Sequence, residues 1–200
     1  METLEALNRS LFLAINATPA TPPWLIDTAL LIADYLIFLV PLMLVLMWLS
    51  GDARQRAIAI RACVVTLLAL GANQLIGLVW THPRPFVLGL GHTFLAHAPD
   101  SSFPSDHGTV YSVLVLTLLL GGMVRTGLLA LAAGVAVAWA RVFVGVHFPF
   151  DMIGAFVVAS VVYAVTAPVW RACGAALTQF SVALYRALLA APIRLGWLRP

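Results

Sequence analysis

Two histidines of this chain lie in polar stretches whose residue types could carry out chemistry. His147 and Asp151 are four residues apart, so on a helix they share one face and can hydrogen-bond. A carboxylate bonded to one imidazole nitrogen fixes the tautomer and leaves a lone pair on the other nitrogen. The spacing therefore predicts a neutral histidine that can act as a nucleophile. His107 follows Ser105 and Asp106 in a second polar run and is the other candidate catalytic histidine.

Two arginines accompany these histidines along the chain. Arg84 and Arg141 fall at the ends of apolar segments, and an arginine inside a bilayer costs at least about 2.5 kcal/mol by insertion scales. Their position next to histidines indicates an anionic ligand. Helix N-termini at Ser105 and near Pro149 would add amide donors and a partial positive charge. These residue types together predict a phosphate site.

The composition identifies the elements that must hold such a site. The 200 residues are 62% hydrophobic and only 10% charged, with a mean hydropathy of +1.00, whereas soluble domains carry roughly 25% charged residues. Eleven arginines, eight acids and no lysine give a net charge of +3. This composition excludes a soluble globule, a disordered chain, a disulfide-stapled secreted fold and a nucleic-acid binder. It predicts an integral membrane protein.

Long apolar runs in such a protein are expected to be helices, because unpaired backbone is not tolerated in lipid. The predicted fold is therefore an all-α, polytopic membrane helix bundle with about five to six spans. The expected spans are 25–49, 57–80, 108–122, 127–146 and 148–169.

The remaining segments complete one domain over residues 1–200. Residues 1–23 and 174–200 mix apolar with polar residues and are predicted to be interfacial segments. Glu2 and Glu5 precede Arg9, so no cleaved signal is expected. Residues 81–106 form a long polar connection, which is typical of a functional loop.

The distribution of arginines predicts the orientation. If the loop at 51–55 is cytoplasmic, eight of the eleven arginines fall on that side, as the positive-inside rule requires. The 81–106 loop and the connection that carries His147 then share the outer face.

The motif residues resemble a known family. Arg84-Pro85, Pro104-Ser105-Asp106-His107 and the run from Arg141 through His147 to Asp151 resemble the three signature motifs of the type 2 phosphatidic acid phosphatase superfamily. The third motif is the specific one, because three residue types must fall at fixed spacing. Residues 82–86, 103–108 and 192–197 further resemble the bacitracin-resistance-type undecaprenyl pyrophosphate phosphatases. The resemblance covers nearly the whole chain and implies a phosphatidic acid phosphatase/vanadium haloperoxidase-like core.

The resemblance implies a role for each motif residue. His147 would attack the terminal phosphorus, giving a phosphohistidine that water hydrolyses, while Asp151 orients its ring. His107 would protonate the departing lipid phosphate. No metal and no other cofactor is implied. The phosphate-binding residues would be Arg84, Ser105 and Arg141, with Asp106 beside them.

Three positions depart from the family pattern. The first motif usually begins with a lysine seven places before its arginine, where this chain has Gly77. The usual glycine of the second motif is Asp106, and the serine before the arginine of the third motif is Ala140. One cationic phosphate contact is therefore missing. The bacitracin-resistance-type subgroup accommodates such changes.

The implied function is removal of the terminal phosphate from undecaprenyl pyrophosphate at the extracytoplasmic face of a bacterial inner membrane, with bacitracin resistance as a consequence. The implied partners are the polyprenyl pyrophosphate lipid and the bilayer, and no nucleic acid. Alternatives within the chemistry are phosphatidylglycerophosphate or phosphatidate hydrolysis and lipid A phosphotransfer. A small membrane transporter is the alternative of another class, and it would place its polar groups near mid-membrane.

Several polar residues have a simpler interpretation. His82, His92 and His97 are most simply interfacial or core residues, although His82, like Pro85 and Pro104, can line the pocket. Asp27 and Asp34 lie on one face of the first span. A structural hydrogen bond between Asp34 and the side-chain amide of Asn73 or Gln74 is expected as readily as a role in substrate binding.

Overall fold

The computed structural model describes residues 2–198, and these form helices and loops. The predicted all-α membrane bundle is confirmed. The elements in chain order are α1 (Glu2–Ile15), α2 (Pro23–Tyr35), the 3₁₀ turn η1 (Leu36–Phe38), α3 (Leu39–Ser50), α4 (Ala53–Val79), α5 (Asp106–Leu120), α6 (Val124–Phe143), α7 (Pro149–Leu188) and α8 (Ala190–Arg194).

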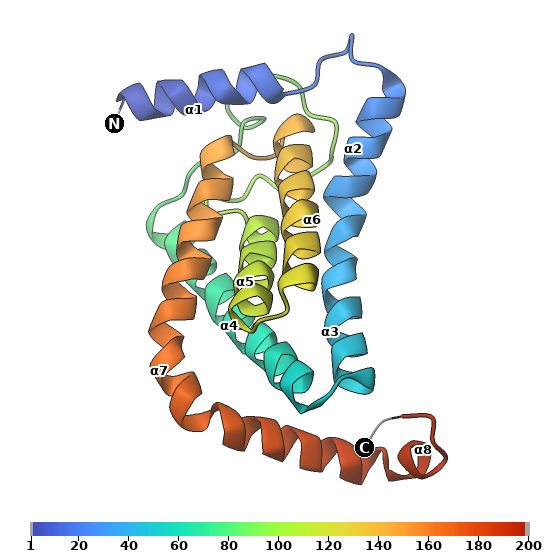
Figure 1. Cartoon of the computed structure of the whole chain (residues 1–200). Helices are drawn as coiled ribbons and strands as arrows, with labels where there is room; N and C mark the ends of the chain where they lie inside the picture. Colours follow the sequence, from blue (N-terminus) through green and yellow to red (C-terminus); the bar gives the residue numbers. More distant parts are fainter. Residues whose placement is uncertain (1, 199–200) are drawn as a thin grey trace.

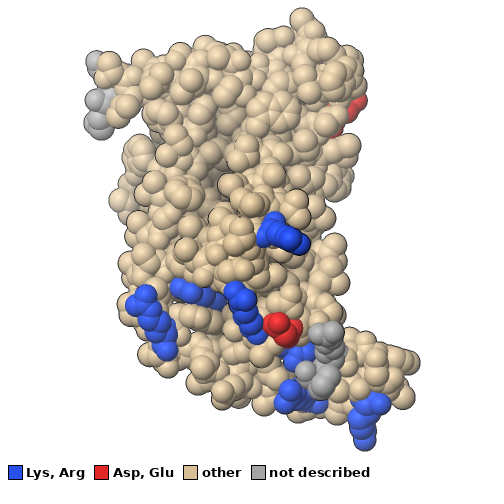
Figure 2. All heavy atoms as spheres, in the orientation of Figure 1, with Lys and Arg blue, Asp and Glu red and all other residues tan. Residues whose placement is uncertain are grey.

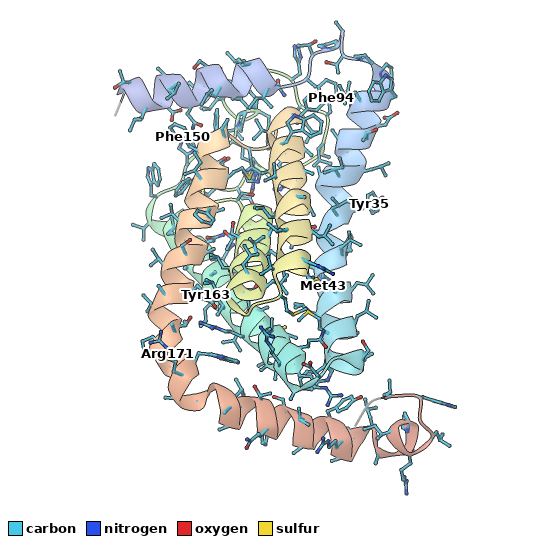
Figure 3. The ribbon with its side chains drawn as sticks, viewed as in Figure 1. Tyr35, Met43, Phe94, Phe150, Tyr163 and Arg171 are labelled. Carbon is cyan, nitrogen blue, oxygen red and sulfur yellow. The ribbon has the colours of Figure 1, made fainter. Side chains whose placement is uncertain are left out.

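The first predicted span is helical but not continuous. α2, η1 and α3 follow one another over Pro23–Ser50, a stretch long and apolar enough to cross a membrane. Pro41 lies in the first turn of α3, and a proline removes the N–H that would bond four residues back and crowds that carbonyl. The tighter 3₁₀ turn at Leu36–Phe38 absorbs this interruption. Figure 3 shows Tyr35 pointing away from the bundle and Met43 turned toward α6.

α5 is the central helix and packs against α4, α6 and α7 (Figure 1). Its 15 residues span only about 22 Å, less than the roughly 30 Å of a hydrocarbon core. Four stretches of the described chain have the length and composition of a span, and α5 is shorter. A short helix suffices here because protein surrounds α5, with Val113 and Leu118 fully buried. Ser105 caps its N-terminus by accepting a hydrogen bond from the Gly108 amide at 3.3 Å.

α4 and α7 complete the framework around α5. α4 begins with a capping box, in which the Asp52 side chain accepts from the Gln55 amide at 2.8 Å and the Gln55 side chain accepts from the Asp52 amide at 2.9 Å. α7 runs for 40 residues and contains Pro168. Its second half turns and lies across one end of the bundle (Figure 1), as expected for a helix that bends after an internal proline.

The two ends of the bundle differ in charge. Figure 2 shows basic side chains gathered toward the end where the second half of α7 lies, whereas the visible face near α1 carries none. α1 lies across the opposite end of the bundle, above the long connection between α4 and α5 (Figure 1). Along the spans, large apolar side chains such as Leu78 and Val165 remain exposed, as a lipid-facing surface requires. The protein is a multi-pass membrane protein.

Candidate phosphate site

The connection between α6 and α7 places His147 and Asp151 together. Pro149 is the first residue of α7, where a proline is well tolerated. The Asp151 carboxylate reaches back over this first turn, so that its Oδ2 accepts a hydrogen bond from the Phe148 amide at 2.8 Å. The same oxygen lies 3.2 Å from His147 Nδ1. Because an ionised carboxylate only accepts, this contact assigns the proton to Nδ1.

The other nitrogen of His147 faces an arginine. Arg84 Nη1 lies 3.1 Å from His147 Nε2 and donates to the Val146 carbonyl at 2.9 Å. A guanidinium is only a donor, so Nε2 is the acceptor and carries the lone pair. Burial, and then the positive charges of Arg84 and Arg141, hold the pKa of His147 well below its ordinary value. The site therefore contains a neutral imidazole with a lone pair toward the pocket.

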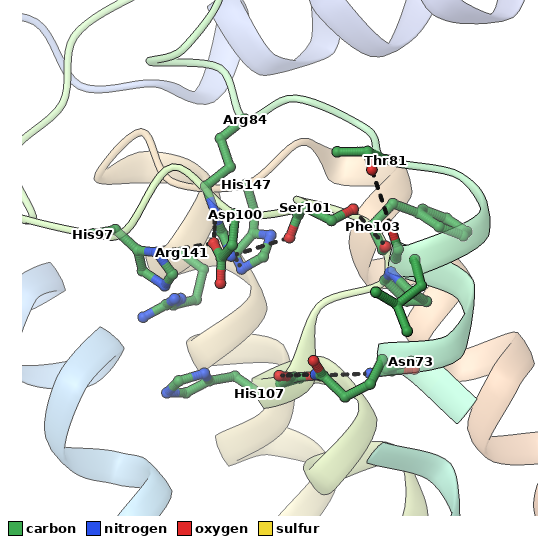
Figure 4. A pocket seen from close by; sticks show the side chains of 15 residues that line it. Asn73, Thr81, Arg84, His97, Asp100, Ser101, Phe103, His107, Arg141 and His147 are labelled. Atoms are coloured by element: carbon green, nitrogen blue, oxygen red, sulfur yellow. Dashed lines mark hydrogen bonds and ion pairs between the residues drawn. The ribbon is translucent and has the colours of Figure 1, made fainter. Parts of the chain in front are cut away.

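A cavity of about 310 Å³ opens at this nitrogen (Figure 4). Arg141 lines it with only 2% of its surface exposed, and its Nε is buried without a hydrogen-bond partner among residues 2–198. A buried charge without a partner is costly, so the pocket is suited to an anion. The lining residues used below are Gly77, Arg84, His97, Asp100, Asp106, His107, Arg141 and His147.

The N-terminus of α5 supplies the opposite wall. His107 lines the pocket and is half-buried, as the second motif predicts. Asp106 also lines the pocket, but its carboxylate is already bound, because Asn73 donates to Oδ1 at 2.8 Å and Gln74 to Oδ2 at 3.4 Å. Asn73 and Gln74 thus donate to Asp106, and the described residues show no hydrogen bond between Asp34 and either amide.

Some predicted site residues lie outside this cavity. Ser105 is fully buried, and its amide donates to the Asp151 carbonyl at 3.3 Å while its hydroxyl caps α5. Its role in holding phosphate stays a prediction. Pro104 lines the pocket, whereas Pro85 does not, and His82 lines a neighbouring cavity beneath α1. His92 is exposed.

The loop between α4 and α5 contributes two further residues to the site. Asp100 Oδ1 accepts from Arg84 Nε at 2.8 Å. Burial raises the pKa of Asp100, but the hydrogen bond and charge of Arg84 outweigh it, so the pKa lies below its usual range. The Ser102 hydroxyl donates to Asp151 Oδ2 and lies 3.4 Å from His147 Nδ1. Asp100 lies 16 positions from Arg84 along the chain, and Ser102 lies 45 positions from His147 and 49 from Asp151, so these contacts join segments that are far apart in the sequence.

Fold and site define a class: an integral membrane protein with a histidine-containing anion site near one end of its helix bundle. The PAP2 superfamily model matches residues 58–175, which include Arg84, His107, Arg141, His147 and Asp151. The chain belongs to this superfamily, and the family predicted from the motifs is confirmed.

Similar proteins agree with this assignment. YbjG of Escherichia coli (strain K12), named as a candidate undecaprenyl-diphosphatase, is 42% identical over 98% of this chain and 99% of its own length. Undecaprenyl-diphosphatase BcrC of Bacillus subtilis (strain 168) is 33% identical over 78% of this chain and 80% of its own. The crystal structure of Aquifex aeolicus LpxE superposes with a TM-score of 0.58 at 22% identity, over 80% of this chain and 94% of that one. The last comparison supports the fold.

Proposed function

We propose that the protein is an undecaprenyl-diphosphatase that removes the terminal phosphate of a polyprenyl pyrophosphate. The substrate follows from the names of YbjG and BcrC. The observation that carries the chemistry is that buried Arg141, whose Nε has no hydrogen-bond partner among residues 2–198, lines the same cavity as His147, which suits this cavity to an anion near a nucleophile. A long-chain substrate is compatible with spans whose outer surfaces are apolar.

In the first step, His147 Nε2 attacks the terminal phosphorus. A nitrogen–phosphorus bond forms, the bond from that phosphorus to the bridging oxygen breaks, and undecaprenyl phosphate leaves. His107 lies among positive charges in the empty site, so it takes up a proton from water when the anionic substrate binds and delivers that proton to the leaving oxygen. Asp151 stabilises the positive charge that His147 gains, through the Nδ1–Oδ2 contact at 3.2 Å.

In the second step, water attacks the phosphohistidine. His107, now neutral, accepts a proton from the water, and the nitrogen–phosphorus bond breaks to release inorganic phosphate. Arg84 and Arg141 hold the equatorial oxygens in both steps, where charge spreads in the transition state. Arg84 must shift its contacts from His147 to the phosphate when substrate binds.

The reaction is proposed to occur at the outer face of a bacterial inner membrane. The basic end of the bundle would then lie in the cytoplasm and the pocket outside, which follows the positive-inside rule. Bacitracin sequesters the pyrophosphate lipid, so overproduction of the protein should raise bacitracin resistance. Unchanged resistance at confirmed expression would argue against this substrate.

The test is phosphate release by the purified protein from undecaprenyl pyrophosphate, phosphatidylglycerophosphate and phosphatidate in parallel, with and without a chelator. We expect the highest kcat/KM for undecaprenyl pyrophosphate and no effect of the chelator. A preference for either glycerolipid would reassign the substrate within the same chemistry. Loss of activity with the chelator would contradict the histidine scheme.

The nucleophile is tested by His147→Ala, with His92→Ala as the matched control because His92 is exposed and outside the pocket. We expect His147→Ala to abolish phosphate release while the protein remains folded and monodisperse. Substrate transport without hydrolysis would instead favour a membrane transporter.

A further inference from the structure

His97 is a histidine of the pocket to which the reaction scheme gives no task. It lies on the loop between α4 and α5, and its side chain is 23% exposed. Its ring centroid is 6.3 Å from that of His147, and it lines the cavity together with Arg141 and His107 (Figure 4). A phosphoryl oxygen held between the two rings would be within reach of both.

The ring of His97 is oriented by the loop that carries it. Nδ1 lies 3.0 Å from the Ala98 carbonyl, which only accepts, so Nδ1 carries a proton. Nε2 is therefore the nitrogen available to a ligand. Asp100 Oδ1 lies 3.6 Å from His97 Nδ1 and also accepts from Arg84 Nε at 2.8 Å. His97 and the phosphate-binding arginine thus share one carboxylate.

The wall facing this loop contains Gly77, where the family pattern has a lysine. Gly77 lines the pocket, and a Cβ at this position would lie 3.3 Å from the Cβ of Ser101. The loop therefore packs against α4 where a longer side chain at position 77 would begin. A positively charged side chain at this wall of the pocket can therefore come from the loop but not from position 77 of α4.

We propose that His97 is a further substrate-binding residue, which takes up a proton on Nε2 when a diphosphate binds and donates it in a hydrogen bond to a phosphoryl oxygen. This contact replaces the one that Gly77 cannot make. The proton comes from bulk water and returns on product release. The proposal rests on the proposed function for the identity of the substrate.

The charges around His97 explain why protonation and binding are coupled. The groups that face it are Arg84, Arg141, Asp100, His107 and His147. Burial lowers the pKa of His97, the Ala98 carbonyl opposes this, and the two arginines lower it further. In the empty site the ring is therefore neutral near pH 7. A diphosphate brings several negative charges between these groups, and an opposite charge favours the protonated form.

The test uses methylenediphosphonate, a diphosphate analogue that cannot be hydrolysed. Its binding to the purified full chain is measured by calorimetry in two buffers of different ionisation enthalpy, which reports proton uptake. The variants are His97→Ala, His97→Lys and His97→Gln, with His92→Ala as the control on the same loop. KM and kcat for undecaprenyl pyrophosphate are measured on the same samples.

We expect His97→Ala to raise the Kd of the analogue and the KM about tenfold, the worth of one charge-assisted hydrogen bond, with kcat changed less than twofold. Proton uptake on binding should decrease, and the uptake that remains belongs to His107, which lies among the same positive charges. His97→Lys should bind within about threefold of wild type with proton uptake reduced in the same way, and His97→Gln should bind with intermediate affinity. His92→Ala should match wild type.

An unchanged Kd and unchanged proton uptake in folded His97→Ala would overturn the proposal, as would a fall in kcat with Kd and KM unchanged. If His97→Ala does not fold, His97→Gln and His97→Lys decide, because equal affinities or undiminished proton uptake would contradict the assignment. If wild type binds the analogue through His97 but does not hydrolyse undecaprenyl pyrophosphate, the proposed function fails and the assignment stands.

Discussion

Ser102 connects the α4–α5 loop to the carboxylate that orients His147. Its hydroxyl donates to Asp151 Oδ2, the oxygen that also contacts His147 Nδ1 and the Phe148 amide. Replacing Ser102 by alanine removes a hydrogen bond to a charged group, worth about 1.5–3 kcal/mol. We expect kcat to fall about tenfold or more with KM nearly unchanged, because Ser102 positions Asp151, which orients the nucleophile His147, and does not touch the substrate. Steady-state phosphate release tests this, and a rise in KM alone would contradict it.

Asp100 places a negative charge next to the proposed phosphate position. Its carboxylate pairs with Arg84 at 2.8 Å but is 62% exposed at the side chain, so the pair contributes only about 0.2–1 kcal/mol. Asp100→Asn removes the repulsion toward an incoming phosphate. We expect inorganic phosphate to inhibit this variant up to about fivefold more strongly than wild type. Weaker inhibition would show that Asp100 mainly holds Arg84 in place.

The neutral state of His147 has a consequence for stability. Its pKa is lowered by burial and by Arg84 and Arg141, whereas in the unfolded chain it is about 6.5. Below pH 6.5 the unfolded state binds the extra proton, so stability falls with decreasing pH by up to about 1.4 kcal/mol per unit. Thermal unfolding between about pH 7.5 and 5 should show this loss, and His147→Asn should reduce it. His92→Asn is the control. If the melting temperature falls with decreasing pH equally steeply in wild type and in His147→Asn, the assignment of His147 as neutral is contradicted.

Single residues differ in how far the sequence could identify them. His147 and Asp151 are found by their spacing, because four residues on a helix bring side chains to one face. Asp100 and Ser102 belong to a loop without helical periodicity, and their partners Arg84 and Asp151 lie in other segments. Only the folded loop shows that Ser102 contacts Asp151 and that Asp100 contacts Arg84.

At the scale of elements, the loop is held by its contact with the α6–α7 connection. Phe94 donates its amide to the Val144 carbonyl at 3.0 Å, and a Cβ at Gly145 would lie 2.1 Å from the His92 carbonyl oxygen. Gly145 also has φ +89°, a conformation that favours glycine. The close approach of these two backbones therefore requires glycine, two residues before His147.

Gly145→Ala tests this contact. Gly89 is the matched control, because it has φ +66° but open space around a Cβ. Backbone strain alone costs roughly 1–2 kcal/mol, so Gly89→Ala should lower the melting temperature slightly and leave activity unchanged. Gly145→Ala must in addition displace the loop, so we expect a larger fall in melting temperature and at least a tenfold loss of phosphate release. Equal effects of the two substitutions would show that the loop does not depend on this contact.

Hydropathy located the crossing helices because each needs about 20 apolar residues. It could not show that α5 is only 15 residues long, since a helix surrounded by protein and one surrounded by lipid have similar composition. The 3₁₀ turn before Pro41 and the extension of α7 to Leu188 were also not predicted. These features depend on how neighbouring helices pack.

For the molecule as a whole, the two ends differ in their chemistry. The pocket, with Arg84 and Arg141, lies near the end covered by α1 (Figure 1). The opposite end, which carries the second half of α7, is the one where basic side chains gather on the surface (Figure 2). Because cytoplasmic segments accumulate arginine, this asymmetry favours a single orientation in the membrane. The pocket would then receive its substrate from the outer leaflet.

Cysteine labelling in intact cells tests this orientation. Cys63 and Cys173 are exposed and are first replaced by alanine. Pro99→Cys places a thiol on the α4–α5 loop at an exposed position outside the pocket lining, and Ala53→Cys places one at the exposed start of α4. We expect a membrane-impermeant maleimide to label position 99 in intact cells and position 53 only after lysis. Labelling of position 53 in intact cells, with position 99 protected, would reverse the orientation and place phosphate release in the cytoplasm. Labelling of both positions would mean that the chain inserts both ways, and the charge asymmetry would then not determine its topology.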